Sequence, residues 1–166
     1  SVASVGDLNG DGFADVIVGA PDYNGSLNLE GAAFIYFGGA GAFNTFSDAR
    51  LDENQTSAKL GSSVAGAGDV NGDGYADVIV GAPYFGNGQT EEGAAFIYYG
   101  GVGVFDDTPD AQLESNQNNA RFGFSVAGAG DLNGDGYADV IAGSPDYDNG
   151  NSNEGAAFVY YGNKSG

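Results

Sequence analysis

Residues 7–15 read Asp-Leu-Asn-Gly-Asp-Gly-Phe-Ala-Asp, and the pattern returns at residues 69–77 and 131–139. Each copy has an Asp or Asn at its first, third, fifth and ninth positions and a glycine at its fourth and sixth. The copies begin 62 residues apart, and residues 63–104 match residues 125–166 at 28 of 42 positions without a gap. A fixed period of this length indicates a chain built from repeated structural units.

The period divides the chain into three units, residues 1–62, 63–124 and 125–166. The third unit is shorter than the others and stops before the part that corresponds to residues 105–124. We expect the three units to form one partial domain and not three independent ones, because a repeat of this kind buries its apolar faces against its neighbours.

Four short strands are expected in each unit. In the second unit, residues 63–68 are small and suit a place where backbones approach closely, and residues 76–81 contain a β-branched run typical of a strand covered on both faces. Residues 93–100 are rich in aromatic side chains, and residues 111–115 are polar with one apolar position, as in an outer edge strand. No helical periodicity is present, and 31 glycines disfavour helices, so the chain is predicted to be all-β.

Four-stranded antiparallel units in series predict the blades of a β-propeller, with the small-residue strand along the axis. A β-sandwich is the competing all-β arrangement, but it gives no reason for strict repetition. Propellers close with about four to eight blades, so three blades, the third without its outer strand, leave two apolar faces exposed. The ring must then be completed either by other copies of the chain or by further blades of a longer parent protein, and the sequence does not decide between them.

The nine-residue stretch carries the chemistry. Side-chain oxygens at positions one, three, five and nine, with the backbone carbonyl of position seven, provide the all-oxygen shell that Ca²⁺ prefers, and the glycines permit a tight turn. We therefore predict three calcium ions per chain. The predicted ligands are Asp7, Asn9, Asp11, Phe13 and Asp15 in the first loop, Asp69, Asn71, Asp73, Tyr75 and Asp77 in the second, and Asp131, Asn133, Asp135, Tyr137 and Asp139 in the third.

The stretch has three other interpretations. An EF-hand requires a Glu at position twelve and flanking helices, whereas Val18, Val80 and Ala142 stand there and strands are expected on both sides. Ordinary Asx turns would explain the aspartates by local hydrogen bonds, but clustered like charges repel one another unless a cation lies among them. Mg²⁺ favours water and strict octahedral geometry. Calcium in a structural role is the preferred interpretation.

Composition excludes several classes of function. The net charge is -19 with only 4 Lys+Arg, which argues against binding to nucleic acid or insertion into an anionic membrane. There is no Cys and no His, so thiol catalysis, Cys-based zinc sites and His-dependent triads are absent. An isolated acidic pair such as Asp106 and Asp107 is weak support for a hydrolase, because neighbouring strand residues point to opposite sides.

Two short signatures recur around each loop. Phe122-Gly123 and its variant Leu60-Gly61 precede a unit's first strand, and the second strand ends in Gly19-Ala20-Pro21, Gly81-Ala82-Pro83 or Gly143-Ser144-Pro145. On these residues the whole chain resembles FG-GAP repeats, the blades of the propeller in integrin alpha subunits and in many bacterial secreted proteins. The resemblance implies a calcium-binding propeller, usually of seven blades, outside the cell or at its surface.

The expected function rests on the loops and the resemblance. We expect a non-enzymatic, calcium-stabilised extracellular module for adhesion or assembly, which associates through its blade faces and meets a protein or glycan ligand through loops such as residues 84–91 and 147–153. A lectin-like, carbohydrate-binding propeller is the alternative, and an accessory domain of a secreted hydrolase is a weaker one. Glu30, Glu92 and Glu154, which precede each third strand, are expected to make turn contacts.

Overall fold

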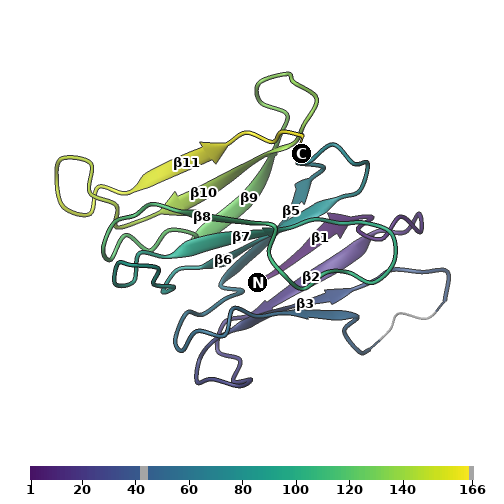
Figure 1. Cartoon of the computed structure of the whole chain (residues 1–166), viewed down its shortest axis with the longest axis horizontal. Coiled ribbons are helices and arrows are strands. Elements are labelled where there is room, and N and C mark those ends of the chain that lie inside the picture. The colour runs from purple at the N-terminus through teal and green to yellow at the C-terminus, as the bar shows by residue number, and fades with distance from the viewer. Residues whose placement is uncertain (42–44, 165–166) are drawn as a thin grey trace.

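The computed structural model describes residues 1–41 and 45–164, which fold into three antiparallel sheets lying side by side in chain order (Figure 1). The first sheet, blade 1, has the order β1-β2-β3-β4, and blade 2 has the order β5-β6-β7-β8. Blade 3 contains β9, β10 and β11, so the expected absence of its outer strand is confirmed within the described residues. The same residues contain no helix, and therefore none that is long and apolar enough to cross a membrane.

The strands agree with the four elements expected from each repeat. Blade 1 consists of β1 (Val2–Gly6), β2 (Asp15–Ala20), β3 (Ala32–Tyr36) and β4 (Ala49–Leu51), blade 2 of β5 (Ser63–Gly68), β6 (Asp77–Ala82), β7 (Ala94–Tyr98) and β8 (Ala111–Glu114), and blade 3 of β9 (Ser125–Gly130), β10 (Asp139–Ser144) and β11 (Ala156–Tyr160). Each sheet is a simple meander, since consecutive strands pair with each other. These blades form an open segment of a β-propeller ring.

The small-residue strands lie together at the inner edge of the blades, as expected. β5 contacts both β1 and β9. A Cβ atom on Gly66 would lie 3.0 Å from the Cα of Val5, and one on Gly128 would lie 2.5 Å from the carbonyl oxygen of Gly66. The inner strands of adjacent blades therefore approach backbone to backbone, which only very small side chains permit.

Position in the array, and not sequence, decides how deeply a strand is buried. β2 and β6 have the same sequence, Asp-Val-Ile-Val-Gly-Ala, yet every residue of β6 is buried while β2 alternates between buried and half-buried. Successive strand residues point to opposite faces of a sheet. Blade 2 is thus covered on both faces, whereas blade 1 and blade 3 are each covered by a neighbour on one face only.

The Phe-Gly and Gly-Ala-Pro signatures lie in contact at the boundary between adjacent blades. Gly61 donates a backbone hydrogen bond to Gly81 (N···O 3.0 Å), and a Cβ on Gly19 would lie 2.1 Å from the carbonyl oxygen of Gly61. At the next boundary, a Cβ on Gly81 would lie 2.0 Å from the carbonyl oxygen of Gly123. The glycine of the Gly-Ala-Pro signature is therefore needed because the Phe-Gly signature of the following blade packs directly onto it.

Candidate metal sites

Each nine-residue loop joins an inner strand to the second strand of its blade. The inner strand ends in a bulge at a glycine with positive φ, Gly6, Gly68 or Gly130, where the register with the second strand shifts. The glycines at loop positions four and six also have positive φ, for example 76° at Gly72 and 92° at Gly74. Because such backbone angles strain any residue with a Cβ, the glycine pattern fixes the shape of the loop.

The first aspartate organises the loop around its carboxylate. In the second loop, Asp69 Oδ1 accepts hydrogen bonds from the backbone N–H groups of Gly72 (2.7 Å) and Asp73 (3.1 Å), and its Oδ2 accepts one from Gly74 (2.9 Å). Asp7 and Asp131 accept the corresponding three bonds in their loops. These amide bonds lower the pKa of Asp131. The three loops therefore share one conformation.

The ninth position has a second role that the sequence did not reveal. Asp77 is fully buried, and its carboxylate accepts hydrogen bonds from the backbone N–H groups of Val70 (2.7 Å) and Gly100 (2.9 Å). Asp15 and Asp139 make the equivalent two bonds. Because Gly100 follows the third strand, this carboxylate ties the start of the loop to the end of a strand 23 residues away.

Burial and neighbouring negative charges both disfavour the ionised form of the aspartate at position nine. Burial is the main cause that raises the pKa of Asp77 to about 7, the charges of Asp73 and Asp69 raise it further, and the two backbone hydrogen bonds oppose both effects. Burial likewise raises the pKa of Asp15. A proton or a cation nearby relieves this repulsion.

The carboxylate and amide oxygens of each loop are the kind of ligand that calcium prefers. A carboxylate offers about four lone-pair sites. Asp69 uses three of them within the loop, while Asp73 uses two, toward Tyr75 N and Asn71 Nδ2, so acceptor capacity remains on each. In residues 1–41 and 45–164, however, no three acidic side chains are gathered into a ready-made metal-binding group. The predicted ligands of each site therefore lie in a single loop, where their side-chain oxygens accept hydrogen bonds from amide groups.

The first and second loops are also bonded to the following blade, both to its loop and to the residues after its third strand. Ala76 N donates to the carbonyl oxygen of Asp7 (3.1 Å), and Gly101 N donates to that of Leu8 (2.8 Å). The second and third loops repeat these bonds, from Ala138 N to Asp69 O (2.9 Å) and from Asn163 N to Val70 O (3.0 Å). Consecutive loops therefore form a chain of hydrogen-bonded contacts along one edge of the array.

An aromatic ring reinforces this connection. A Cβ on Gly10 would lie 2.5 Å from the ring of Tyr75, and one on Gly72 would lie 2.4 Å from the ring of Tyr137. The aromatic residue at loop position seven thus covers the glycine at position four of the preceding loop. Gly134, in the last loop, has nothing within 4 Å of such a Cβ.

The recurrent glutamates have a structural role, in agreement with the turn contacts expected of them. Glu30 is buried, and its carboxylate accepts hydrogen bonds from the backbone N–H groups of Ser26 and Leu27, both at 2.9 Å. Glu92 is also buried and accepts a bond from Asn87 N. These carboxylates hold the loop between the second and third strands.

The comparisons with known proteins agree with this geometry. The FG-GAP repeat family matches residues 1–42, 60–98 and 122–160. The chain is 37% identical over 143 residues to integrin alpha-6 of Gallus gallus, 35% identical over 150 residues to integrin alpha-5 of Xenopus laevis, and 36% identical over 145 residues to integrin alpha-PS3 of Drosophila melanogaster. These alignments cover 84 or 85% of this chain and 13 or 14% of each relative.

Repeated four-stranded blades with an Asp-rich loop after each inner strand define a repeat protein of the propeller class. Within that class, this chain belongs to the FG-GAP repeat family, since the family matches all three repeats. It spans only about an eighth of the length of the integrin alpha chains it resembles.

Proposed function

We propose that the chain is a non-enzymatic, calcium-stabilised extracellular module for adhesion or assembly. The observation that carries the proposal is the linked row of loops, in which Asp69 and its counterparts hold one conformation and the first and second loops each bond to the blade that follows. A cation bound in such a loop would stabilise the turn and, through the next blade's hydrogen bonds, the contact between blades. Calcium would supply only positive charge and coordination.

The proposed ligands are those predicted from the sequence, namely the side chains at positions one, three, five and nine and the carbonyl oxygen of position seven. Positions one and five are exposed or half-buried, while position nine is fully buried. A cation would thus approach from the solvent side of the loop. Extracellular modules with all-oxygen sites commonly bind calcium at about 10⁻⁴ to 10⁻³ M, so occupancy is expected outside the cell.

The assembly part of the proposal is supported by two complementary blade faces. In blade 2, Val78, Val80 and Phe96 are buried against blade 1. Their counterparts in blade 1, Val16, Val18 and Phe34, are half-buried. The free face of blade 1 therefore carries apolar residues at the same strand positions as the face of blade 2 that packs against blade 1.

Blade 3 presents the opposite face. Ile79, Ala95 and Ile97 of blade 2 are buried in the cluster shared with blade 3, whereas Ile141 is half-buried and Val159 is 45% exposed. The free face of blade 3 therefore complements the free face of blade 1, as in a head-to-tail interface that can close a ring. Two copies would provide six blades, within the range of known propellers.

The family supports the adhesion part. The relatives found are integrin alpha chains, and the matched region is the repeat itself. The integrin alpha chains are cell-surface proteins, which supports an extracellular place for this chain as well. We assign it no catalytic site, because its recurrent acids hold loops and its composition contains no His or Cys.

Thermal unfolding in 5 mM CaCl₂ and in excess chelator tests the calcium role. With 10⁻⁴ to 10⁻³ M affinities, each occupied site should contribute roughly 1–2 kcal/mol by mass action. Asp73→Asn should reduce the bound calcium by one ion, while Asp107→Asn, an exposed acid outside the loops, should leave it unchanged. Unchanged melting together with no bound calcium would refute the proposal.

Sedimentation in calcium tests the assembly role separately. A dimer or larger assembly that dissociates on Val18→Asp but persists on Val104→Asp, at a residue 98% exposed in a loop, supports packing through blade faces. A strict monomer at high protein concentration would rule out assembly between copies of this chain and leave further blades of a longer parent as the partner.

A further inference from the structure

Asn-Gly peptide bonds recur in two places of every repeat. One set lies in the nine-residue loops, at Asn9, Asn71 and Asn133. The other set lies between the second and third strands of each blade, at Asn24, Asn87 and Asn149. Asparagine before glycine is prone to lose its amide group, because the glycine nitrogen, unhindered by a Cβ, can attack the asparagine side-chain carbon and close a five-membered imide. The six bonds are chemically alike, so their surroundings decide which of them reacts.

The nine-residue loops hold both partners of this reaction apart. In the second loop, Asn71 Oδ1 accepts a hydrogen bond from Asp73 N (2.9 Å), and Asn71 Nδ2 donates one to Asp73 Oδ2 (2.9 Å). Gly72 N donates its hydrogen to Asp69 Oδ1 (2.7 Å). The first and third loops repeat these three bonds. Attack of the glycine nitrogen on the asparagine would have to break them.

The asparagines between the second and third strands are held less firmly in blades 1 and 2. Asn24 Oδ1 accepts a hydrogen bond from Leu29 N (2.7 Å). The following glycine is crowded, since a Cβ on Gly25 would lie 2.0 Å from a carboxylate oxygen of Glu30. Asn87 Nδ2 donates to Glu114 Oε2 (3.1 Å). Each of these two carboxamides is therefore fixed by one hydrogen bond.

Asn149 lacks even this restraint. Within residues 1–41 and 45–164, its carboxamide makes no hydrogen bond and Gly150 N has no acceptor. Both residues are exposed, and a Cβ on Gly150 would have nothing within 4 Å. The main-chain N–H of Asn149 donates to Glu154 Oε2 (3.2 Å), which leaves the side chain free to turn toward Gly150 N.

We propose that Asn149 is a site of spontaneous deamidation and that the nine-residue loops protect their own asparagines from the same reaction. Gly150 N gives up its proton to solvent and bonds to Asn149 Cγ, the bond from Cγ to Nδ2 breaks, and the nitrogen leaves as ammonia. Water then opens the imide. Opening at Cγ yields aspartate, and opening at the main-chain carbonyl carbon yields isoaspartate. One water is consumed for each ammonia released, and no oxidant or reductant takes part.

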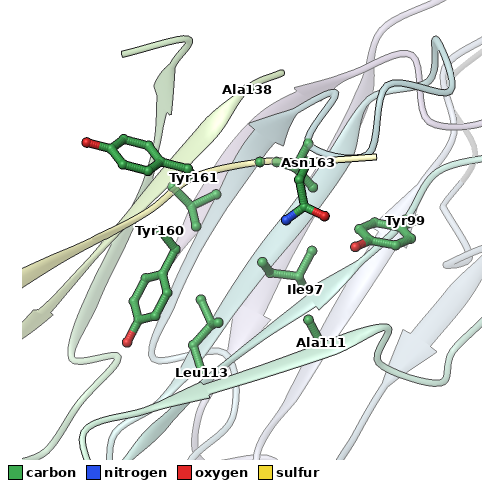
Figure 2. A pocket seen from close by; sticks show the side chains of 11 residues that line it. Ile97, Tyr99, Ala111, Leu113, Ala138, Tyr160, Tyr161 and Asn163 are labelled. Carbon is green, nitrogen blue, oxygen red and sulfur yellow. The ribbon is translucent and has the colours of Figure 1, made fainter. Parts of the chain in front are cut away.

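Asn163 separates the effect of exposure from that of the following residue. It is exposed, and its carboxamide faces the apolar cavity of about 230 Å³ between blades 2 and 3 that Ile97 and Ala111 also line (Figure 2). Among the described residues this carboxamide also makes no hydrogen bond. Lys164 follows it, and the Cβ of a lysine hinders attack by its main-chain nitrogen. Asn163 is therefore an internal control.

The product changes the loop that contains Asn149. It places a carboxylate beside Glu154, which accepts hydrogen bonds from Asn149 N (3.2 Å) and Asn151 Nδ2 (2.6 Å), and like charges repel. Isoaspartate also adds one carbon to the main chain inside the turn that the bond from Asn153 N to Asp148 Oδ1 (2.5 Å) closes. This loop is one of those expected to meet a partner. An effect on a partner rests on the proposed function, whereas the reaction itself does not.

Ageing of the full chain in mildly alkaline buffer, followed by peptide mapping with fragmentation, tests the proposal. Excess chelator keeps the test independent of the proposed calcium role. Asn149 should convert at least about tenfold faster than Asn71 or Asn133, because one hydrogen bond to a charged acceptor slows a step by about that factor. In concentrated urea all six bonds should react at similar rates, and Asn163 should stay slow throughout. Similar rates in the folded chain, or an Asn149 that reacts only in urea, would overturn the proposal.

Two variants identify the cause. Asn149→Gln should remove the fast conversion, because glutamine closes a six-membered imide much more slowly. Glu114→Ala frees the carboxamide of Asn87 and should raise its conversion toward the rate of Asn149, with Asn71 unchanged. Fast conversion that persists in Asn149→Gln would place the reaction elsewhere, against the proposal. An unchanged rate at Asn87 in Glu114→Ala would show that side-chain hydrogen bonds do not control the reaction, which would also overturn it.

Discussion

Replacing Phe105 by Ala tests whether the interface between blades 1 and 2 depends on a side chain from a glycine-rich connecting segment. Phe105 is 7% exposed and packs in the cluster that contains Leu51 and Tyr98. Truncation of a buried Phe to Ala generally costs about 3–5 kcal/mol. Because the connecting segment can relax into the space more easily than a strand, we take the lower end, about 3 kcal/mol.

For a chain of this size, a loss of that magnitude corresponds to a decrease in the melting temperature of about 10 °C. Urea unfolding followed by circular dichroism, with thermal melting as a second readout, measures it. Val104→Ala is the matched control, since it removes an adjacent apolar side chain that is 98% exposed and should change stability by less than about 0.5 kcal/mol.

The result that would refute the reasoning is a Phe105→Ala protein as stable as the control. Hydrogen exchange distinguishes the reason. Asp110 N donates to Ile97 O (2.9 Å) next to the segment, so faster exchange there without a change in melting would mean that Phe105 anchors only its own loop. An unchanged exchange pattern and melting temperature would mean that the ring contributes nothing to the interface.

Three further outcomes are expected. Gly72→Ala should destabilise the chain by at least about 1 kcal/mol more than Gly134→Ala. Both substitutions introduce the same backbone strain (φ 76° and 77°), but only Gly72 lies under the ring of the next loop's aromatic residue. Equal losses of stability in urea unfolding would contradict this. Burial is the main cause that raises the pKa of Glu53 above its ordinary 4.5, and the charge of Asp52 adds to it while the bond from Tyr98 opposes it. The folded chain therefore binds this proton more tightly than the unfolded chain, so the wild type should lose stability relative to Glu53→Gln as the pH rises from 4.5 through the raised pKa. Urea unfolding of both proteins across pH 4 to 7 measures this difference. A wild type that gains stability relative to the variant over this range would contradict the prediction. Calorimetric titration with calcium should show two tighter sites and one weaker, and three equal sites would count against the coupling of each loop to the blade after it.

The strand pattern could be predicted because it is local. The β-branched run of β6 and the polar edge strand β8 each occupy positions that their own residues specify, and the 62-residue period gave their number and order. The sequence also predicted that β6 is covered on both faces. The identical sequence of β2 is half-buried on one face, because a neighbouring blade covers only the other face of blade 1, and no local pattern distinguishes the two strands.

The residues of the candidate site could be predicted from the sequence, but their hydrogen-bond partners and packing contacts could not. The period and the donor types pointed to Asp77, but its partner Gly100 lies 23 residues away and appears in no local pattern. The packing of Tyr75 on Gly10 was missed for the same reason, since only the fold brings consecutive loops together. Phe105 could have been found from sequence, because Phe43 precedes it by one period although residues 44–47 differ from residues 106–109 at every position.

Three loops of nearly identical sequence differ in whether a further blade covers them. Leu8 and Val70, at position two of the first and second loops, are 0% and 5% exposed because the next blade covers them, whereas Leu132 is 57% exposed. The carbonyl groups of the first two loops accept hydrogen bonds from the following blade, and an aromatic ring covers their position-four glycines. Stability in an array of this kind resides in nearest-neighbour contacts, so a loop is preorganised for a cation to the degree that its successor is present. A blade packed onto the free face of blade 3 would therefore do for the third loop what blade 3 does for the second, and this would couple the proposed assembly of a ring to the proposed binding of calcium.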